Sequence, residues 1–408
     1  MRIRQQGELR PPGRSRAELK VVDISLEVSV VLPCLDEAQT VALCVRQALE
    51  ALCSMDVSGE VLVVDNGSSD GSAEVARRAG ARVILESRRG YGSALKRGIQ
   101  EARGKFVIIA DADNSYDLSD LERFVRPLRD GADFVMGSRR LGTIERGAMP
   151  WLNRRIGNPA LSGLLNLFFG GRISDAHCGM RAVSKDAFAR MKVREPGMEF
   201  ASEMVVKAVL AGMRIVEVPI TLRPDGRIGR GPHLRPFRDG WRHLRYMLLL
   251  SPTYVFLIPA LILIVIGGVA LAALGRGPIR IDGFAFDFHY MILGSLFTIL
   301  GVQILMTWLC AKTYSQSLRL SHDDRLLRFI NTWFSLERGL ALGTILFLAG
   351  FVVDADVLIG WLRRGMGQLN AIRPATLAST LMIIGAQTIF SSFFLSMLLR
   401  LPADQELD

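Results

Sequence analysis

Residues Lys105 to Asp117 read KFVIIADADNSYD. The apolar run Phe106–Ala110 is typical of a strand buried in a parallel sheet. Two acids, Asp111 and Asp113, follow it directly. In open α/β sheets ligands bind beyond the carboxyl ends of the strands, so both acids are expected at a ligand crevice. Carboxylate oxygens suit Mg²⁺ or Mn²⁺, which proteins commonly share with substrate phosphates. The stretch therefore predicts a metal held by Asp111 and Asp113 that in turn binds a nucleotide diphosphate.

Strand-like and helix-like segments alternate on both sides of this stretch. The other predicted strands are Glu27–Leu32, Glu60–Val64, Arg82–Glu86, Ala132–Met136 and Arg214–Thr221. Helices are predicted from Asp36 to about Cys53, up to Arg78, from Gly90 to about Gly104, and over Leu118–Arg129, Trp151–Phe169 and Glu199–Leu210. This alternation favours right-handed βαβ units and a mostly parallel sheet.

Acids stand at the ends of three of the first four strands. Asp65 ends the second strand, and Asp36 and Glu37 follow the first. Together with Asp111 and Asp113 they are expected at one edge of the sheet, because the carboxyl ends of parallel strands lie side by side. The alternative is that these acids only cap helices and stabilise turns.

The second half of the 408-residue chain contains four long apolar stretches. They are Tyr254–Leu274, Phe288–Ala311, Leu336–Leu362 and Thr376–Leu399. Each is long enough to cross a hydrocarbon core of about 30 Å. The loop between the second and third stretches is rich in Lys and Arg, which predicts that it and the N-terminal domain lie on the cytoplasmic side. The prediction is an integral protein of the cytoplasmic membrane, with a flexible tail (1–26), a globular domain (27–222), an Arg-rich segment (223–253) and a membrane domain (254–408).

The net charge of +10 raises the question of nucleic-acid binding. The chain has no recognition-helix pattern, no RNA-binding aromatic signature and no zinc spacing, so a nucleic-acid partner is not expected. Arginines instead gather between Arg223 and Arg245, just before the first apolar stretch. Such a cluster suits lipid phosphates. The alternative is that it only sets the topology of the spans.

Several motifs together resemble a known family. Pro33-x-x-Asp36-Glu37, Val63–Gly71 (VVDNGSSDG) and Asp111-Ala112-Asp113 are similar to motifs of the inverting family-two glycosyltransferases. Gly90-Tyr91-Gly92-x-Ala94, Gly137-Ser138-Arg139 and Asp175–Arg181 (DAHCGMR) narrow the resemblance to polyprenyl-phosphate glycosyltransferases of the dolichol-phosphate mannose and glucose synthase type. The resemblance covers about residues 27–239, and the four spans match only in architecture. It implies an α/β GT-A-type nucleotide-sugar-binding domain followed by an all-α transmembrane domain of four helices.

The resemblance also implies roles for particular residues. The implied nucleotide-sugar site comprises Pro33, Asp36, Glu37, Asp65, Asn66, Gly67, Ser68, Gly90, Asp111 and Ala112. The implied acceptor-phosphate contacts are Arg139, Arg154, Arg155, Arg181, Arg227 and Arg230. Asp113, Arg139, Asp175 and Arg181 are expected to take part in catalysis. Ser115 stands where some members have a Gln that contacts the metal, which leaves a third protein ligand open. Asp175 is expected to orient Arg181 or a sugar hydroxyl, or to have a purely structural role.

A phosphate acceptor agrees with this residue set. A phosphate monoester is largely dianionic at neutral pH and needs little help from a general base. Holding two anions together requires a cation and arginines. We therefore expect inverting transfer of a hexose, glucose or mannose, from a nucleotide sugar (UDP-glucose before GDP-mannose) to polyprenyl phosphate at the cytoplasmic membrane face. The alternatives are transfer to a lipid or polysaccharide hydroxyl, which needs a general base, and a non-enzymatic scaffold or translocator for lipid-linked sugars. Whether the chain forms a homo-oligomer stays open.

Overall fold

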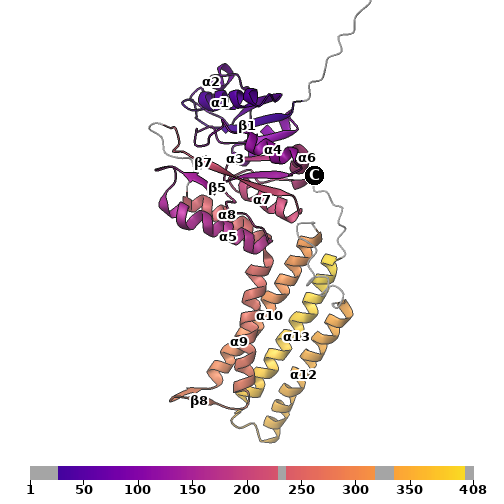
Figure 1. The fold of residues 1–408 in the computed structure, drawn as a ribbon. Helices are drawn as coiled ribbons and strands as arrows, with labels where there is room; N and C mark the ends of the chain where they lie inside the picture. Colours follow the sequence, from indigo (N-terminus) through magenta and orange to yellow (C-terminus); the bar gives the residue numbers. More distant parts are fainter. Residues whose placement is uncertain (1–25, 228–235, 318–334, 400–408) are drawn as a thin grey trace, which may run out of the picture.

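The computed structural model describes residues 26–227, 236–317 and 335–399. The predicted tail, apart from Leu26, and the predicted acceptor residue Arg230 lie outside these residues. Within them, a mixed α/β domain stands at one end of a group of long helices (Figure 1).

A seven-stranded sheet forms the centre of the N-terminal domain, in the order β3-β2-β1-β4-β6-β5-β7. The strands are β1 (Val28–Cys34), β2 (Gly59–Asp65), β3 (Arg82–Leu85), β4 (Phe106–Ile109), β5 (Phe134–Ile144), β6 (Arg181–Ser184) and β7 (Ile215–Leu222). Strand β6 runs antiparallel to both of its neighbours, β4 and β5. The other pairs are parallel, which confirms the predicted mostly parallel sheet.

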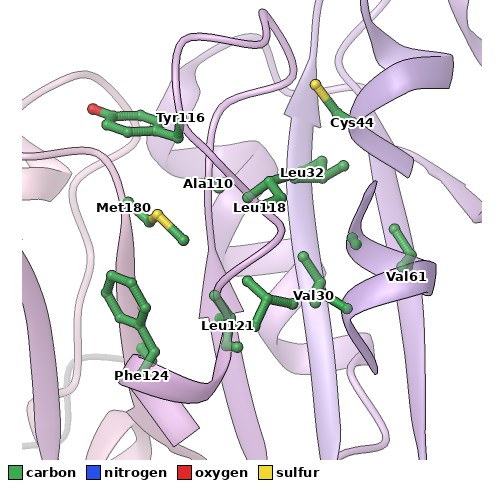
Figure 2. Packing of buried hydrophobic residues seen from close by; sticks show 14 of the residues in the cluster. Val30, Leu32, Cys44, Val61, Ala110, Tyr116, Leu118, Leu121, Phe124 and Met180 are labelled. Carbon is green, nitrogen blue, oxygen red and sulfur yellow. The ribbon is translucent and has the colours of Figure 1, made fainter. Parts of the chain in front are cut away.

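Helices cover both faces of this sheet. They are α1 (Val41–Ser54), α2 (Ser72–Arg78), α3 (Tyr91–Glu101), α4 (Glu122–Arg129), α5 (Asn158–Phe169), α6 (Lys185–Met191), α7 (Phe200–Leu210) and α8 (Pro236–Leu250). One core cluster joins α1, α2 and α4 to the sheet, with Val30, Leu32 and Phe124 among its members (Figure 2). The second cluster joins α3, α5, α6, α7 and α8 to the opposite face. Burial of these apolar faces is the main force that holds the layers together.

The strand order brings the predicted acids together. Strand β1 lies between β2 and β4, with Cys34 beside Asp65 in one pair and Val31 beside Ile109 in the other. The three strands are parallel, so the residues that follow them emerge at the same edge. The prediction that acids after these three strands lie at one edge is confirmed.

Local boundaries differ from the prediction where turns compete with helices. The first helix begins at Val41 and not at Asp36, because Asp36 has a positive φ of 55° and belongs to a turn. Strand β5 continues past Met136 to Ile144, paired with β7. The predicted helix Trp151–Phe169 is helical throughout, with a π-helical turn, η1 (Asn153–Gly157), before α5.

Four long apolar helices make up most of the C-terminal region, as predicted. After a π-helical turn, η2 (Thr253–Leu257), they are α9 (Ile258–Leu274), α10 (Phe288–Ser317), α12 (Leu336–Arg363) and α13 (Ile372–Leu399). Helix α9 contacts α10, α10 contacts α13, and α13 contacts α12. A small hairpin that the sequence did not predict, β8 (Ile279–Ile281) and β9 (Phe284–Phe286), joins α9 to α10. It lies at the end of the helices far from the sheet (Figure 1).

Candidate functional site

The two acids after β4 form the centre of the site. Tyr91 Oη donates to Asp111 Oδ1 at 3.0 Å, and the Ser115 backbone N–H donates to Asp113 Oδ1 at 3.0 Å. Burial, together with the neighbouring charge of Asp113, raises the pKa of Asp111 to about 7. Each carboxylate therefore has one oxygen fixed by the protein, and the pair carries closely spaced negative charge.

The pair fits a divalent cation. Asp111 Oδ2 accepts no hydrogen bond from any of the described residues, and it faces Gly179, where an added Cβ would lie only 2.7 Å from it. Within the described ranges no group of three or more Asp, Glu, His or Cys side chains is arranged to hold a metal. The protein would thus supply two carboxylates at most, and phosphate oxygens of a bound nucleotide would complete the coordination, the usual arrangement for Mg²⁺.

The loops after β1 and β2 are tied together beside this pair. The Asp36 N–H donates to Ser68 Oγ at 2.9 Å, and the Ser69 N–H donates to Asp36 Oδ1 at 2.7 Å. Asp65 accepts from the Ser68 N–H at 3.3 Å. The structure thus groups Asp36, Asp65 and Ser68, as the sequence predicted, and their backbone geometry is set by mutual hydrogen bonds.

Other predicted donor-site residues have structural partners. Asn66 donates from Nδ2 to the carbonyls of Glu86 and Arg88, at 2.9 and 2.8 Å, and accepts from the Gly90 N–H at 2.7 Å. Its side-chain amide therefore connects the loop after β2 to the loop between β3 and α3. Gly67 supplies a positive φ of 90° to the turn after β2. Pro33 pairs with a β2 residue in the sheet, and the buried Ala112 accepts a hydrogen bond from Thr40 Oγ1 at 2.8 Å.

A buried ion pair connects β5 to the loop that ends at β6. Arg139 donates from Nε to Asp175 Oδ2 at 2.6 Å and from Nη2 to Oδ1 at 2.7 Å. Their side chains are only 10% and 3% exposed. Although burial opposes ionisation of Asp175, its bonds to Arg139 hold its pKa below the ordinary value. The expectation that Asp175 orients Arg181 is corrected, because its partner is Arg139. A contact with a sugar hydroxyl and a purely structural role stay predictions.

Arg181 lies in the protein interior. Its Nε, Nη1 and Nη2 donate to the carbonyls of Cys178, Ala201 and Ala176 at 2.7, 2.6 and 2.9 Å, and the residue is 2% exposed. All three guanidinium nitrogens are thus used by backbone acceptors. Arg181 therefore stabilises the loop 174–181, and it is not exposed as the predicted acceptor residues Arg154 and Arg155 are.

The remaining predicted arginines occupy two different places. Arg154 and Arg155 are exposed on η1, which leads into α5. Helix α5 contacts α8, and both lie between the sheet and the long helices (Figure 1). Tyr254 Oη, at the start of the membrane helices, donates to the Leu167 carbonyl of α5 at 2.8 Å. Arg227, by contrast, reaches the site centre, where its guanidinium contacts Asp113 and Glu37.

Two features of the site were missed in the sequence. Tyr91, quoted in the sequence only as part of the motif Gly90-Tyr91-Gly92-x-Ala94, donates a hydrogen bond to Asp111. The second feature links α8 to the loop 174–181: His177 Nε2 lies 3.0 Å from Ser202 Oγ, which lies 2.8 Å from His243 Nδ1.

The first prediction concerns Gly179→Ala. The new Cβ would lie 2.7 Å from Asp111 Oδ2 and 2.9 Å from Tyr116 Oη, so one of them must move. Overpacking of this kind costs about 1–3 kcal/mol, and we expect nucleotide to bind about tenfold more weakly in the presence of Mn²⁺. Calorimetric titration with UDP and GDP checks this. Gly163→Ala on α5, where nothing lies within 4 Å, is the matched control, and equal affinities for the two variants would contradict the prediction.

The second prediction concerns acid stability. Burial lowers the pKa of His243 from 6.5 to about 4, assisted by Arg181 and Arg242 and opposed by Asp239, and burial likewise lowers the pKa of His177. Between pH 6.5 and 4 the unfolded chain binds a proton at residue 243 that the folded chain does not, so the free energy of unfolding falls as pH falls. The expected loss is roughly 3 kcal/mol. Unfolding curves of wild type and His243→Gln across this range check it. The free energy of unfolding of the variant should fall less steeply between pH 6.5 and 4, because the variant lacks the imidazole of residue 243.

Comparison with known proteins follows the same division of the chain. Residues 29–191 match the family described as Glycosyl transferase family 2, and residues 309–399 match the Glycosyltransferase family 2 C-terminal transmembrane region. The low-salt glycan biosynthesis hexosyltransferase Agl6 of Haloferax volcanii is 38% identical over 381 residues, which cover 92% of this chain and 90% of that protein.

Two further similarities cover a smaller share of the chain. A dolichyl-phosphate hexose transferase of the same organism is 35% identical over 187 residues, covering 45% of this chain and 78% of that protein. Among solved structures, glucosyl-3-phosphoglycerate synthase from Mycobacterium tuberculosis is 22% identical, with a TM-score of 0.43, and the match covers 59% of this chain and 85% of that one.

Proposed function

The chain belongs to glycosyltransferase family 2, and from this premise we propose that it transfers a hexose from a nucleotide sugar to a polyprenyl phosphate. The observation that carries the proposal is that the carboxylate pair Asp111 and Asp113 and four apolar helices belong to one chain, joined through α5 and α8. A polar donor and a lipid acceptor can then meet at the membrane surface. The similarity to a dolichyl-phosphate hexose transferase supports the same acceptor class.

The donor side is assigned to the edge formed by β2, β1 and β4. Asp111 and Asp113 would hold Mg²⁺ or Mn²⁺, and the loops that carry Asp36 and Asp65 would border the base and ribose. The bound cation would neutralise negative charge that develops on the departing nucleoside diphosphate. The Tyr91 hydroxyl keeps Asp111 oriented, and the Ser115 N–H does the same for Asp113.

The acceptor side is assigned to arginines. Arg139 is held rigidly by Asp175, with both side chains almost buried, which suits a preorganised phosphate contact. Arg154 and Arg155 are exposed on η1, ahead of α5, where they would attract the lipid phosphate. The forks of Arg154 and Arg155 would bind phosphate through two parallel hydrogen bonds and so fix the direction of the attacking oxygen. Arg139, whose Nε and Nη2 are bonded to Asp175, would contribute its remaining nitrogen, Nη1.

The state of Asp175 bears on the choice of acceptor. A hydroxyl acceptor needs a general base, and Asp175 is the carboxylate among the predicted catalytic residues that lies outside the metal pair. It is engaged by Arg139 through both oxygens, and its pKa is held low. A carboxylate so engaged is a poor proton acceptor. A phosphate nucleophile, which is already ionised near neutral pH, needs none, so we favour the phosphate over a lipid or polysaccharide hydroxyl.

The catalytic domain is proposed to face the cytoplasm. Lys312, Arg319, Arg325 and Arg328 gather between the second and third spans. The hairpin region between the first two spans carries Arg276 and Arg280 balanced by Asp282 and Asp287. The positive-inside rule places the first group, and with it the catalytic domain, on the cytoplasmic side.

A donor screen tests the proposal. Full-length protein in detergent is given UDP-glucose, GDP-mannose and related nucleotide sugars with Mg²⁺, with and without polyprenyl phosphate, and the release of nucleoside diphosphate is measured. One donor should give release that depends on the lipid phosphate. Release that depends instead on diacylglycerol or an oligosaccharide would favour the hydroxyl-acceptor alternative.

A further inference from the structure

Arg227 has a position in the site that the assignment to acceptor phosphate does not explain. After β7 the chain turns back along the loop that carries the two acids. The Arg223 N–H donates to the Ser115 carbonyl at 2.9 Å, and the Gly226 N–H donates to the Asp113 carbonyl at 2.9 Å. Two backbone hydrogen bonds thus bring Arg227 directly over the carboxylate pair.

The Arg227 guanidinium touches three carboxylates there. Its Nε donates to Glu37 Oε1 and Oε2 at 2.9 and 3.1 Å, and its Nη2 makes a further close contact with Glu37. The same Nη2 lies 3.4 Å from Asp113 Oδ2, and Nη1 lies 3.4 Å from an oxygen of Asp225. The Arg227 side chain is 12% exposed and that of Glu37 is 5% exposed. These contacts are therefore only weakly screened by solvent.

Arg227 and a divalent cation would compete for one oxygen of Asp113. Asp113 Oδ1 is occupied by the Ser115 N–H, which leaves Oδ2 as the oxygen that can serve a cation. In this structure Oδ2 is the oxygen that Arg227 contacts. A guanidinium and a divalent cation carry charge of the same sign, so each weakens the binding of the other at this oxygen.

The distances indicate that the contact of Arg227 with Asp113 is weaker than its contacts with Glu37. The Glu37 contacts are shorter and use two donor nitrogens, whereas the Asp113 contact is a single one at 3.4 Å. Charge-assisted bonds to both oxygens of a carboxylate are the stronger type. Arg227 can therefore leave Asp113 while it stays attached to Glu37, without leaving a buried carboxylate unpaired.

We propose that Arg227 is the resting counter-ion of the donor site, and that a divalent cation arriving with a nucleoside diphosphate displaces its guanidinium from Asp113. The displaced guanidinium nitrogen then becomes available to an incoming phosphate. The donor is therefore expected to bind before the acceptor. This inference rests on the donor half of the proposed function only, since no acceptor takes part in the displacement.

Cation binding in the absence of acceptor tests the proposal. Mn²⁺ is titrated into full-length wild type, Arg227→Gln and Arg223→Gln, and free Mn²⁺ is measured by electron paramagnetic resonance. Arg227→Gln should bind Mn²⁺ alone more tightly, by roughly 5- to 150-fold, the usual range for coupled sites. Arg223→Gln removes a neighbouring arginine that pairs with Asp117, and its affinity should equal that of wild type.

The same titration with UDP or GDP present completes the test. If nucleotide and cation have already displaced Arg227, the difference in Mn²⁺ affinity between wild type and Arg227→Gln should shrink severalfold. An Arg227→Gln variant that is folded and binds Mn²⁺ no more tightly than wild type would overturn the proposal, as would a difference in affinity unchanged by nucleotide. If Arg227→Gln fails to fold, Glu37→Gln/Arg227→Gln, which removes both buried charges, is used instead. These results do not depend on whether polyprenyl phosphate is the acceptor.

Discussion

Asp113→Asn is expected to lower kcat/KM for hexose transfer by about 10²- to 10³-fold or more, the range seen when one preorganised charge-stabilising group is removed. The substitution keeps an oxygen for the Ser115 N–H but removes the negative charge that a cation needs. Only Asp111 would then remain of the two carboxylates. The measurement is initial-rate kinetics at saturating Mg²⁺ with purified full-length protein.

Asp117→Asn is the matched control for this substitution. Asp117 lies in the same loop, but it pairs with Arg223 and accepts from Ser119, away from the carboxylate pair. Its loss should change the rate only a fewfold. An Asp113→Asn variant that keeps activity within a fewfold of wild type would contradict the assignment of the metal to this pair.

The second large effect is expected at the buried pair Arg139 and Asp175. Asp175→Ala leaves the guanidinium of Arg139 uncompensated at a place where only 10% of its side chain is exposed. Removing one partner of a buried ion pair costs about 3–5 kcal/mol. We therefore expect a clear drop in the unfolding midpoint of Asp175→Ala, measured in detergent by circular dichroism.

The double variant Arg139→Met/Asp175→Ala separates stability from function. It removes both charges, and replacement of a buried pair by apolar side chains is often close to neutral. We expect it to recover most of the lost stability and to remain poorly active, because Arg139 is missing. Full activity in a stable double variant would contradict a role for Arg139 in the acceptor site. A double variant as unstable as Asp175→Ala would show that the unpaired charge of Arg139 is not the cause of the lost stability.

The sheet and the carboxylate pair could be predicted because both depend on neighbouring residues. The apolar run Phe106–Ala110 followed at once by two acids indicates a buried strand and the residues beyond its end. Strand alternation then predicted the parallel sheet, and the order β2-β1-β4 placed the acids at one edge. The four membrane helices were predicted for the same reason, since length and apolar composition alone indicate them.

The ion pairs of the site could not be predicted because their partners are far apart in sequence. Arg139 and Asp175 are 36 residues apart, and Arg227 and Glu37 are 190 apart. Sequence motifs identified these residues but gave no pairing. The same limit explains Arg181, whose three backbone acceptors depend on how the loop 174–181 folds against α7. Asp36, read as the start of a helix, belongs to a turn fixed by serines of the next loop.

The chemical nature of the lipid product tests the central claim most directly. Protein in liposomes that contain polyprenyl phosphate is given the radiolabelled donor selected by the screen, with Mg²⁺, and the lipid extract is separated by thin-layer chromatography before and after mild acid. We expect one labelled lipid whose hexose is released by mild acid, as is typical of a glycosyl phosphodiester. A labelled lipid that survives the acid, or label that enters lipid equally well without polyprenyl phosphate, would contradict it.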